Sequence, residues 1–349
     1  NQDYIFKFDA DNVYVVGCKF SGETTPIKIA EDRKNIEIFG NGFQTTASDV
    51  IIINSPTFIV SGPSVKIIGN SFENVGDIES INLIPENGNL EGEKGFKGNV
   101  LIAKNTFKNT KVVLKGYDDV ISIVSIIDNE FTKVGDLIET EVALWMKDIS
   151  GGVVFGNTFD EIDNGIEVKS SENLMFVNNE LERTNPDNSH GIRSVALTNS
   201  IISNNSFSNY DVSIRNYNGQ ANTFLENSFY GSGIYNIQVQ NSQNSVIAGG
   251  NHLLSSVSNN IYIKDSTNTI LYDNDLGIDN SVYIIESPNT QLYNVSYNLV
   301  EIAVASKAYF FYPIQINIKD NENNPVDNAQ VIIKDDDTGE IVSQYLTGP

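Results

Sequence analysis

The sequence of 349 residues has little of several things that constrain a fold or a function. It contains one cysteine, so no disulfide within the chain can hold it together. It has 22 lysine and arginine residues against 45 acidic ones, and its formal net charge is −23. A surface this negative disfavours nucleic acids and anionic membranes as partners. No apolar run is long enough to span a bilayer, and no segment shows sustained helical periodicity.

Asparagine, by contrast, is frequent and regularly placed. Along most of the chain an asparagine recurs at intervals of 22 to 35 residues, and a phenylalanine or leucine follows two residues after it. These anchor asparagines are Asn41, Asn70, Asn105, Asn129, Asn157, Asn179, Asn205, Asn227, Asn251 and Asn274. Cys18 occupies the same position in the first unit, followed by Phe20. A period of this length indicates stacked repeats rather than a single closed core.

The residues before each anchor alternate between apolar and other side chains, which is typical of a strand with one buried face. The third residue before each anchor is apolar throughout, with Ala248 in that position before Asn251. A second strand follows roughly ten residues later, for example at 165–168 and 191–194. Units of about 23 residues are too short for a strand–helix–strand unit. The pattern therefore predicts an all-β fold, a right-handed single-stranded parallel β-helix of about twelve coils.

The anchors also predict how neighbouring coils hold together. We expect the asparagine amides to bond to their counterparts one coil away, and the phenylalanines to stack beside them. Asparagine tolerates the left-handed conformation that a sharp corner needs, so the anchors are expected to be the corner residues. Cys18 is expected to be a small buried side chain at the start of this ladder rather than a reactive thiol.

The anchors and the two strands that begin Gly165-Ile166 and Gly191-Ile192 carry a resemblance to a known family. The sequence resembles the pectate-lyase-like superfamily, and within it the NosD-like proteins built from parallel β-helix repeats. The resemblance covers about residues 5–305 and implies the fold. It implies little about function, because the superfamily includes lyases, hydrolases, phage spikes, adhesins and surface proteins.

The period ends near Ser306, so we place the β-helix at 1–307 and a second module at 308–349. Residues 312–333 have the pattern strand, acidic turn, Pro-Val and strand, which resembles the start of a carboxypeptidase-regulatory-like or Ig-like β-sandwich. About forty residues make only half of such a module. Either the natural chain continues past Pro349, or another subunit completes the module by adding strands.

The candidates for catalysis lie in one row on the second strand. Glu167, Arg193 and Arg215 each stand twelve residues before an anchor, so they should stack on successive coils, with His190 in the turn before Arg193. The superfamily resemblance implies that an arginine there neutralises a uronate carboxylate, beside calcium-binding acids, while a base removes the C5 proton. The alternative is an outward Glu–Arg pair worth under about 1 kcal/mol. The sequence favours this alternative, because no acids cluster beside the arginines.

Two further kinds of site are suggested by short motifs. Asp273, Asp275 and Asp279 alternate as the acids of a calcium loop do, although the final glutamate of an EF-hand is missing. The sequence predicts no cofactor, although so acidic a surface could bind calcium weakly. Asn204 and Asn294 begin N-glycosylation sequons, which chance alone also produces in a chain rich in asparagine and serine.

Taken together, these features favour a non-enzymatic extracellular protein of the cell surface, with a structural or adhesive role in a layer, sheath, filament or adhesin. Self-association or other surface subunits are then the expected partners. The alternative is a carbohydrate-active enzyme, a polysaccharide lyase or glycoside hydrolase, whose substrate groove lies near Arg193 and whose partner is a polysaccharide. The two functions differ in whether acids and bases converge on one face of the coils.

Overall fold

The computed structural model describes residues 4–29, 33, 35–45, 49–53, 65–74, 79–83, 98–116, 121–133, 142–256, 258–274, 276, 281–295, 299–303, 305–311, 330–334 and 341–346. The chain divides into two compact units, Asn1–Phe311 and Tyr312–Pro349. The part of the chain that is described contains no helix that could span a membrane.

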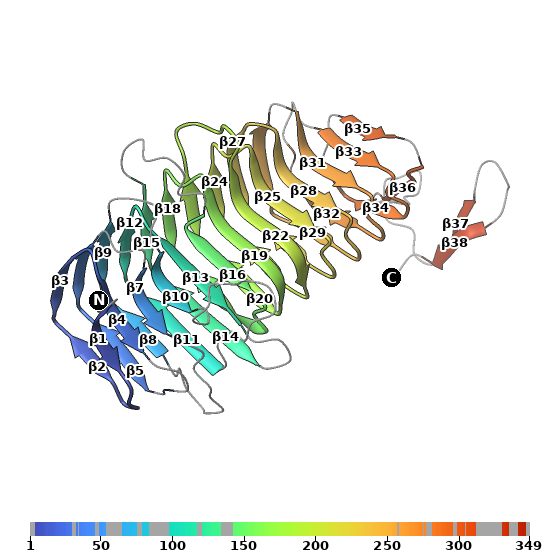
Figure 1. Cartoon of the computed structure of the whole chain (residues 1–349). Helices are drawn as coiled ribbons and strands as arrows, with labels where there is room; N and C mark the ends of the chain where they lie inside the picture. The colour runs from blue at the N-terminus through green and yellow to red at the C-terminus, as the bar shows by residue number, and fades with distance from the viewer. Residues whose placement is uncertain are drawn as a thin grey trace, which may run out of the picture. The chain divides into compact units, whose positions relative to one another are not determined.

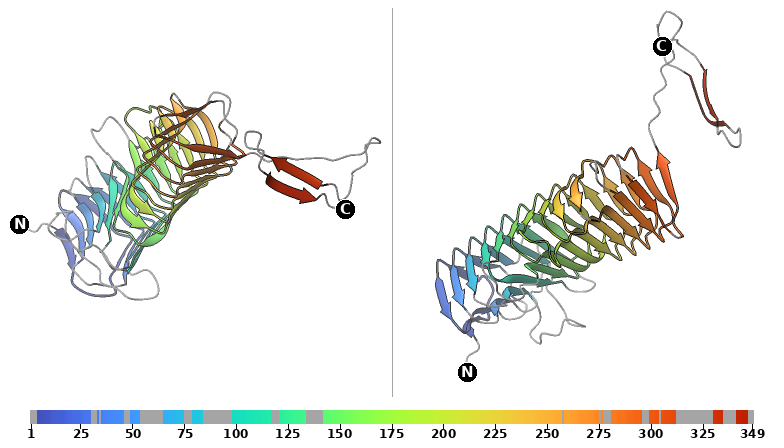
Figure 2. Two further views of the ribbon diagram at one scale, coloured as in Figure 1. Left: turned by 90° about the vertical axis from the view of Figure 1, so that its right-hand side faces the viewer. Right: turned by 90° about the horizontal axis from the view of Figure 1, so that it is seen from above.

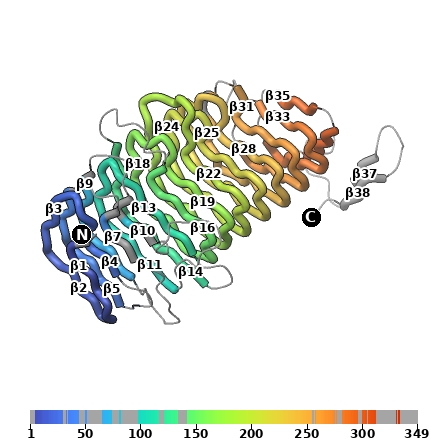
Figure 3. The backbone as a smooth tube through the Cα atoms, viewed as in Figure 1, coloured from blue at the N-terminus to red at the C-terminus, as the bar shows by residue number. Residues whose placement is uncertain are grey.

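The first unit consists of three sheets, which we call A, B and C (Figures 1 and 3). Sheet A has thirteen strands, in the order β1 (Tyr4–Phe8), β4 (Thr25–Ile29), β7 (Asp49–Ile53), β10 (Glu79–Leu83), β13 (Lys111–Lys115), β16 (Leu144–Lys147), β19 (Asn164–Glu172), β22 (His190–Thr198), β25 (Val212–Tyr217), β28 (Tyr235–Gln240), β31 (Asn259–Lys264), β33 (Ser281–Ile285) and β35 (Leu299–Ile302).

Sheets B and C complete each coil. Sheet B also has thirteen strands, in the order β2 (Tyr14–Val16), β5 (Ile36–Phe39), β8 (Val65–Ile68), β11 (Gly98–Ala103), β14 (Ser122–Ile127), β17 (Gly151–Phe155), β20 (Leu174–Val177), β23 (Ile201–Ser203), β26 (Thr223–Leu225), β29 (Val246–Ala248), β32 (Ile270–Tyr272), β34 (Thr290–Tyr293) and β36 (Ala308–Phe311). Sheet C has ten, in the order β3 (Lys19–Gly22), β6 (Gly42–Thr45), β9 (Ser71–Asn74), β12 (Thr106–Lys108), β15 (Glu130–Thr132), β18 (Thr158–Asp160), β21 (Glu180–Glu182), β24 (Ser206–Ser208), β27 (Ser228–Ser232) and β30 (His252–Ser256).

Each strand of these sheets pairs in parallel with the equivalent strand one coil further along the chain, as β19 does with β22 and β22 with β25. The coils are therefore stacked in sequence order, which Figure 2 shows from above. This arrangement is a parallel β-helix, and it confirms the predicted fold. The expected number of coils, about twelve, compares with thirteen strands in each of sheets A and B.

The anchor asparagines form an unbroken ladder of hydrogen bonds from Asn41 to Asn274. Asn129 is representative: its backbone N–H and its Nδ2 both donate to Oδ1 of Asn157, at 2.9 Å each. The same Nδ2 also donates to the backbone oxygen of Ile102, at 2.9 Å. All ten anchors are at most 2% exposed, so each amide replaces lost water contacts with bonds to the neighbouring coils.

The prediction that the anchors themselves are the left-handed corner residues is wrong. The residue immediately before the anchor has the positive φ, for example 64° at Gly69, 52° at Asp128 and 54° at Asn204. The anchor amide has to point into the interior to reach the next coil, whereas the residue before it turns the chain at the surface. The two tasks therefore fall to neighbouring residues.

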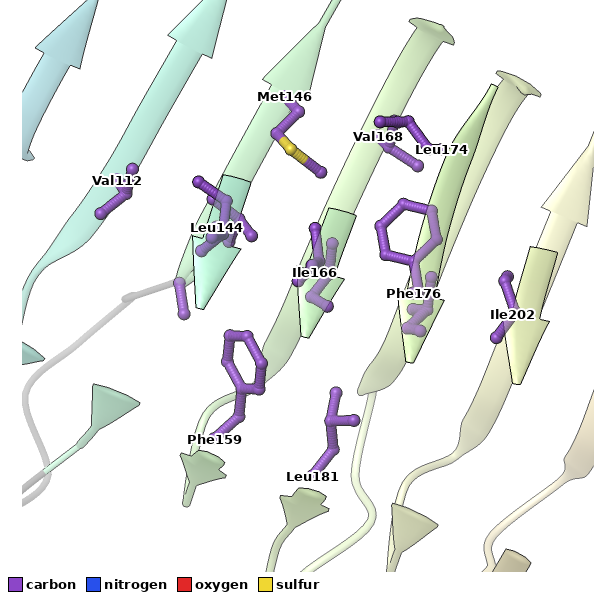
Figure 4. Close-up of a cluster of buried hydrophobic side chains, with 14 of the residues drawn as sticks. Val112, Leu144, Met146, Phe159, Ile166, Val168, Leu174, Phe176, Leu181 and Ile202 are labelled. Carbon is purple, nitrogen blue, oxygen red and sulfur yellow. The ribbon is translucent and has the colours of Figure 1, made fainter. Parts of the chain in front are cut away.

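The interior beside the ladder is filled by aromatic and aliphatic side chains (Figure 4). Six phenylalanines from Phe20 to Phe159 stack with successive ring centroids 4.7–4.9 Å apart, close to the spacing of parallel strands. Leu181 takes the next place, and Phe207 and Phe229 resume the stack at 5.2 Å. The row therefore accepts leucine as well as phenylalanine.

The unit that ends at Asn251 differs from the sequence pattern. Ile247, not Ala248, takes the inward position, since it pairs with Phe224 and Leu271 and is fully buried. The corner before this anchor contains two glycines, of which Gly250 has a φ of 81°. The extra residue moves the strand by one position, which reverses the faces of its side chains.

A second polar row, which the sequence analysis did not predict, lies between sheets A and B. The backbone N–H of Ser242 donates to Oγ of Ser266 at 3.2 Å, Ser266 donates in the same way to Ser287 at 3.1 Å, and Ser287 to Ser306 at 3.2 Å. Serines are common throughout this chain, so their spacing is harder to recognise than that of the anchors.

Cys18 is exposed, contrary to the expectation that it is buried. Its backbone N–H donates to Oδ1 of Asn41 at 2.8 Å, so its main chain does begin the ladder. Sheet C begins at β3, the strand that directly follows Cys18, so no described strand of that sheet covers the thiol from the other side.

In the second unit the described residues form one antiparallel hairpin, of β37 (Gln330–Lys334) and β38 (Ile341–Leu346). Most of the segment 312–333, which suggested a β-sandwich, lies outside the described residues. The carboxypeptidase-regulatory-like or Ig-like module at 308–349 therefore stays a prediction.

Candidate functional site

The predicted row of charged residues lies on the outer face of sheet A. Glu167 on β19 pairs with Arg193 on β22, which pairs with Arg215 on β25. Their neighbours Ile166, Val168, Ile192 and Ile214 are fully buried, because side chains alternate between the two faces of a strand. The row continues in both directions, and we call its part from β16 to β33 the outward row: Trp145, Glu167, Arg193, Arg215, Gln238, Tyr262 and Tyr283.

Glu167 holds two cations on this face. Its side chain is 7% exposed, with Oε1 at 2.5 Å from Nζ of Lys169 and Oε2 at 3.5 Å from Nη1 of Arg193. A carboxylate this buried needs such partners to remain charged. Glu167 therefore restricts where the Arg193 guanidinium can lie, while the Arg193 side chain itself remains 40% exposed.

His190 lies against the arginines in a fixed orientation. Its Nδ1 is 3.0 Å from Oδ1 of Asn164, and its Nε2 is 3.4 Å from Nη1 of Arg215. An amide oxygen only accepts hydrogen bonds and a guanidinium only donates them. Nδ1 must therefore carry the proton, and the lone pair of Nε2 accepts a hydrogen bond from Arg215. This is the tautomer that a general base needs on the Nε2 side.

The electrostatics of the site keep this imidazole neutral. Burial, followed by the positive charges of Arg215 and Arg193, lowers the pKa of His190 to about 4. Burial and the charge of Arg193 also lower the pKa of Arg215, which as a guanidinium still stays charged at neutral pH. No described carboxylate forms an ion pair with Arg215. The site therefore combines a neutral base with a cation that can take an incoming anion.

The remainder of the outward row has a different chemistry on each side of the arginines. On the side of lower residue numbers, Lys147 and Lys169 follow two residues after Trp145 and Glu167, and Nζ of Lys169 lies 5.9 Å from the centre of the Trp145 ring. The sequence analysis did not predict these lysines as part of the site. Their position two residues after the row, on the same face, was the available signal.

On the other side the row is uncharged as far as Tyr283, which pairs with the exposed Glu301 of β35. The ring of Tyr262 lies 4.7 Å from that of Tyr235 and 5.6 Å from that of Tyr283, centre to centre. Burial is the main cause that raises the pKa values of Tyr235 and Tyr262, so both phenols are uncharged at neutral pH. Gln238 separates this stack from Arg215 along the row.

Calcium, which the superfamily resemblance implies, does not fit the residues around the arginines. Calcium needs about six to eight oxygen ligands, whereas the carboxylate of Glu167 is already paired with Lys169 and Arg193. Within the described residues, no group of three histidine, cysteine or acidic side chains could hold a metal. The cations that the described residues provide here are the side chains of lysine and arginine.

The other predicted sites lie elsewhere. Asp273 is an exposed corner residue whose carboxylate accepts a hydrogen bond from Nδ2 of Asn294 at 2.7 Å, while Asp275 and Asp279 lie outside the described residues. Asn204 and Asn294, the two sequon asparagines, are both exposed at corners with positive φ. Their glycosylation stays a prediction.

Two comparisons found no match: neither any protein-family model nor any curated protein sequence resembles the chain closely enough. Solved structures do share its fold. The periplasmic alginate epimerase AlgG has a TM-score of 0.54 at 16% identity, covering 86% of this chain and 78% of its own. A mannuronic acid specific polysaccharide family 6 lyase from human gut microbiota has a TM-score of 0.52 at 12% identity, covering 86% and 81%.

These findings correct the preference for a non-enzymatic structural or adhesive protein. Two solved structures that share the fold over most of the chain are an epimerase and a lyase, both of which are carbohydrate-active, and this favours the alternative function. The preference rested on the regular stack and the appended module, and also on the lack of a convergent set of acids and bases in the sequence. In the structure His190, Arg215, Arg193 and Glu167 do converge, through contacts between neighbouring coils.

Proposed function

We propose that this protein is a carbohydrate-active enzyme that removes the C5 proton of a uronate unit in an anionic polysaccharide. The observation that carries the proposal is His190, a neutral imidazole whose unprotonated Nε2 accepts a hydrogen bond from Arg215 and whose Nδ1 is held by Asn164. A base of this kind beside cations suits the removal of a proton next to a carboxylate, because the cations stabilise the charge that develops on the carboxylate.

The proposed step uses only residues of this face. The uronate carboxylate binds Arg215 and Arg193, and His190 Nε2 takes the C5 proton. The electrons of the broken C–H bond move into the carboxylate, whose added negative charge the two guanidinium groups stabilise. A proton delivered by water to the opposite face of C5 gives the epimer, and His190 then releases its proton to water. Loss of the C4 oxygen with the bonding electrons, and transfer to it of the proton held by His190 Nε2, gives an unsaturated product. Both reactions share this first step.

The named activities of the structural neighbours support the same reaction class, since an alginate epimerase and a mannuronic acid specific lyase both act on uronate polymers. Polysaccharide is thus the proposed partner. An extracellular or periplasmic location follows from it, because polymers of this kind are met outside the cytoplasm, and one neighbour is described as periplasmic.

The test is to incubate the protein with a panel of uronate polysaccharides and follow the products by proton NMR. We expect either a changed ratio of C5 epimers or signals of unsaturated chain ends, with at least one polymer. Arg215→Gln should abolish the conversion of the polymer. The control Arg33→Gln alters an arginine that forms an ion pair with Asp9, and it should leave the conversion unchanged. No change with any member of a panel that includes mannuronate, guluronate and galacturonate polymers would refute the proposal.

A further inference from the structure

The outer face of sheet A is asymmetric about the reacting position. Toward lower residue numbers lie the cations Lys147, Lys169 and Arg193, which we call the cationic half. Toward higher residue numbers lie Gln238, Tyr262, Tyr283, Tyr235 and Gln240, which we call the neutral half. Arg215 lies at the boundary between the two halves.

The neutral half offers hydroxyl and amide groups rather than ring faces. Because the three tyrosine rings stack on one another along the coil axis, each face of the middle ring is covered by a neighbouring ring. What remains accessible are the ring edges and the phenol groups. Phenols and amides both donate and accept hydrogen bonds, as sugar hydroxyls do. These side chains are half-buried or more, so they are held in place before a ligand arrives.

A carboxylate would be poorly placed in the neutral half. Lys264, two residues after Tyr262, is the cation of this part of sheet A, and the charges of Asp265 and Glu286 both act on Tyr262. A second uronate bound here would meet one lysine but the three acids Asp265, Glu286 and Glu301, whereas an uncharged sugar would not be repelled by these acids. In the cationic half positive charge is in excess, since Lys147, Lys169 and Arg193 are three cations against the two acids with which they pair, Asp148 and Glu167.

We propose that this face binds its polysaccharide in one direction, with charged uronate units over the cationic half and uncharged or carboxyl-modified units over the neutral half. The inference rests on the proposed function, because it takes the polymer to lie along the outward row. From Arg215 to Tyr283 is three coil steps, roughly 14 Å at the usual strand spacing. A single sugar cannot reach both, so the preference appears only with oligosaccharides.

The experiment measures dissociation constants by calorimetry for four tetrasaccharides of one backbone. One carries uronates throughout, one is fully carboxyl-reduced, and two are mixed, with uronates in only the reducing or only the non-reducing half. We expect one mixed compound to bind within about threefold of the full uronate, and its mirror arrangement to bind at least about tenfold more weakly. Equal affinity of the two mixed compounds, or no binding by any compound, would overturn the inference.

A variant shows whether the neutral half is responsible. Tyr262→Phe keeps the ring stack but removes one phenol, so the favoured mixed compound should bind roughly 2- to 12-fold more weakly, the effect of one hydrogen bond. Tyr272→Phe removes an exposed phenol from sheet B and should leave the dissociation constant of the same compound unchanged. An unchanged affinity in Tyr262→Phe would contradict the assignment of this half.

The outcome for the proposed reaction is read separately, by incubating the same four compounds with the enzyme and looking for products. Directional binding without turnover would refute the proposed reaction, but would be consistent with the division of the face into a cationic and a neutral half. Turnover without directional binding would refute the proposed division of the face into a cationic and a neutral half, but would be consistent with the proposed reaction.

Discussion

Nε2 of His190 lies 3.4 Å from Nη1 of Arg215, which belongs to the next coil. In the free protein the guanidinium thus faces the same lone pair that would accept the C5 proton. A carboxylate accepts hydrogen bonds from arginine more strongly than an imidazole does, because both partners are then charged. A bound uronate would therefore draw Arg215 toward itself and leave Nε2 available beside C5, so binding of the substrate also prepares the base.

Replacing the base should abolish most of the activity. A positioned general base contributes about 10²- to 10⁴-fold to a rate, so kcat/KM of His190→Gln should fall by a factor in this range. His252 is the other histidine of the chain and is exposed on sheet C, which makes His252→Gln the matched control. Retention of more than a third of the activity in His190→Gln would show that another group is the base.

The protonation of His190 can be followed directly by NMR titration of its ring protons. Burial and two arginines lower its pKa to about 4, so the imidazole of the folded protein should stay neutral until the pH falls well below 6. Arg215→Gln removes one positive charge but leaves the burial, and the pKa should rise without reaching that of an exposed histidine. A titration near pH 6.5 in the unaltered protein would contradict this electrostatic description.

The asparagine ladder should be a large contributor to stability. Asn157→Ala removes the acceptor of the Asn129 amide and backbone N–H, and the donor to Asn179, all of them buried. Each unsatisfied buried group costs about 1–3 kcal/mol, so the free energy of unfolding in urea should fall by more than about 2 kcal/mol. Asn185→Ala, at an exposed position, should change it by less than about 0.5 kcal/mol. Equal effects of the two changes would argue against the ladder.

The phenylalanine row should tolerate leucine and not alanine. Leu181 and Leu253 already occupy equivalent places in sheet C, so Phe131→Leu should cost about 1–1.5 kcal/mol. Phe131→Ala leaves a cavity between Phe107 and Phe159 and should cost about 3–5 kcal/mol. The comparison of the two variants by urea unfolding checks whether shape or only apolar volume matters here.

The repeat made the fold predictable, because a fixed spacing with one amide and one aromatic residue per unit permits few arrangements other than a stack. Local details were less accessible. The glycine pair before Asn251 moves Ile247 into the core. The alternation of apolar and polar residues in the preceding strand gives no sign of the extra residue. Likewise, the left-handed conformation at the corner is adopted by residues as different as Lys104, Asp128 and Glu226, whose side chains have no chemistry in common.

The row of Glu167, Arg193 and Arg215 was predictable in the same way, since all three keep one distance from an anchor. The contact between His190 and Arg215 was not. The sequence placed His190 in a turn, whereas in the structure it is the first residue of β22, and whether a residue at that end of a strand reaches the neighbouring coil depends on how the corner before it folds. Without that contact the arginines lack a base, and this is why the sequence favoured a protein without catalytic function.

The central claim is that His190 removes the C5 proton of a uronate, and solvent deuterium tests it most directly. The protein is incubated in D₂O with the polysaccharide that it converts, and the deuterium at C5 of the recovered polymer and products is measured by NMR and mass spectrometry. We expect deuterium at C5 with the unaltered protein if the proton is returned, or loss of the C5 hydrogen if the product is unsaturated, and neither with His190→Gln. Conversion that leaves every C5 hydrogen in place, or that continues unchanged in His190→Gln, would contradict the claim.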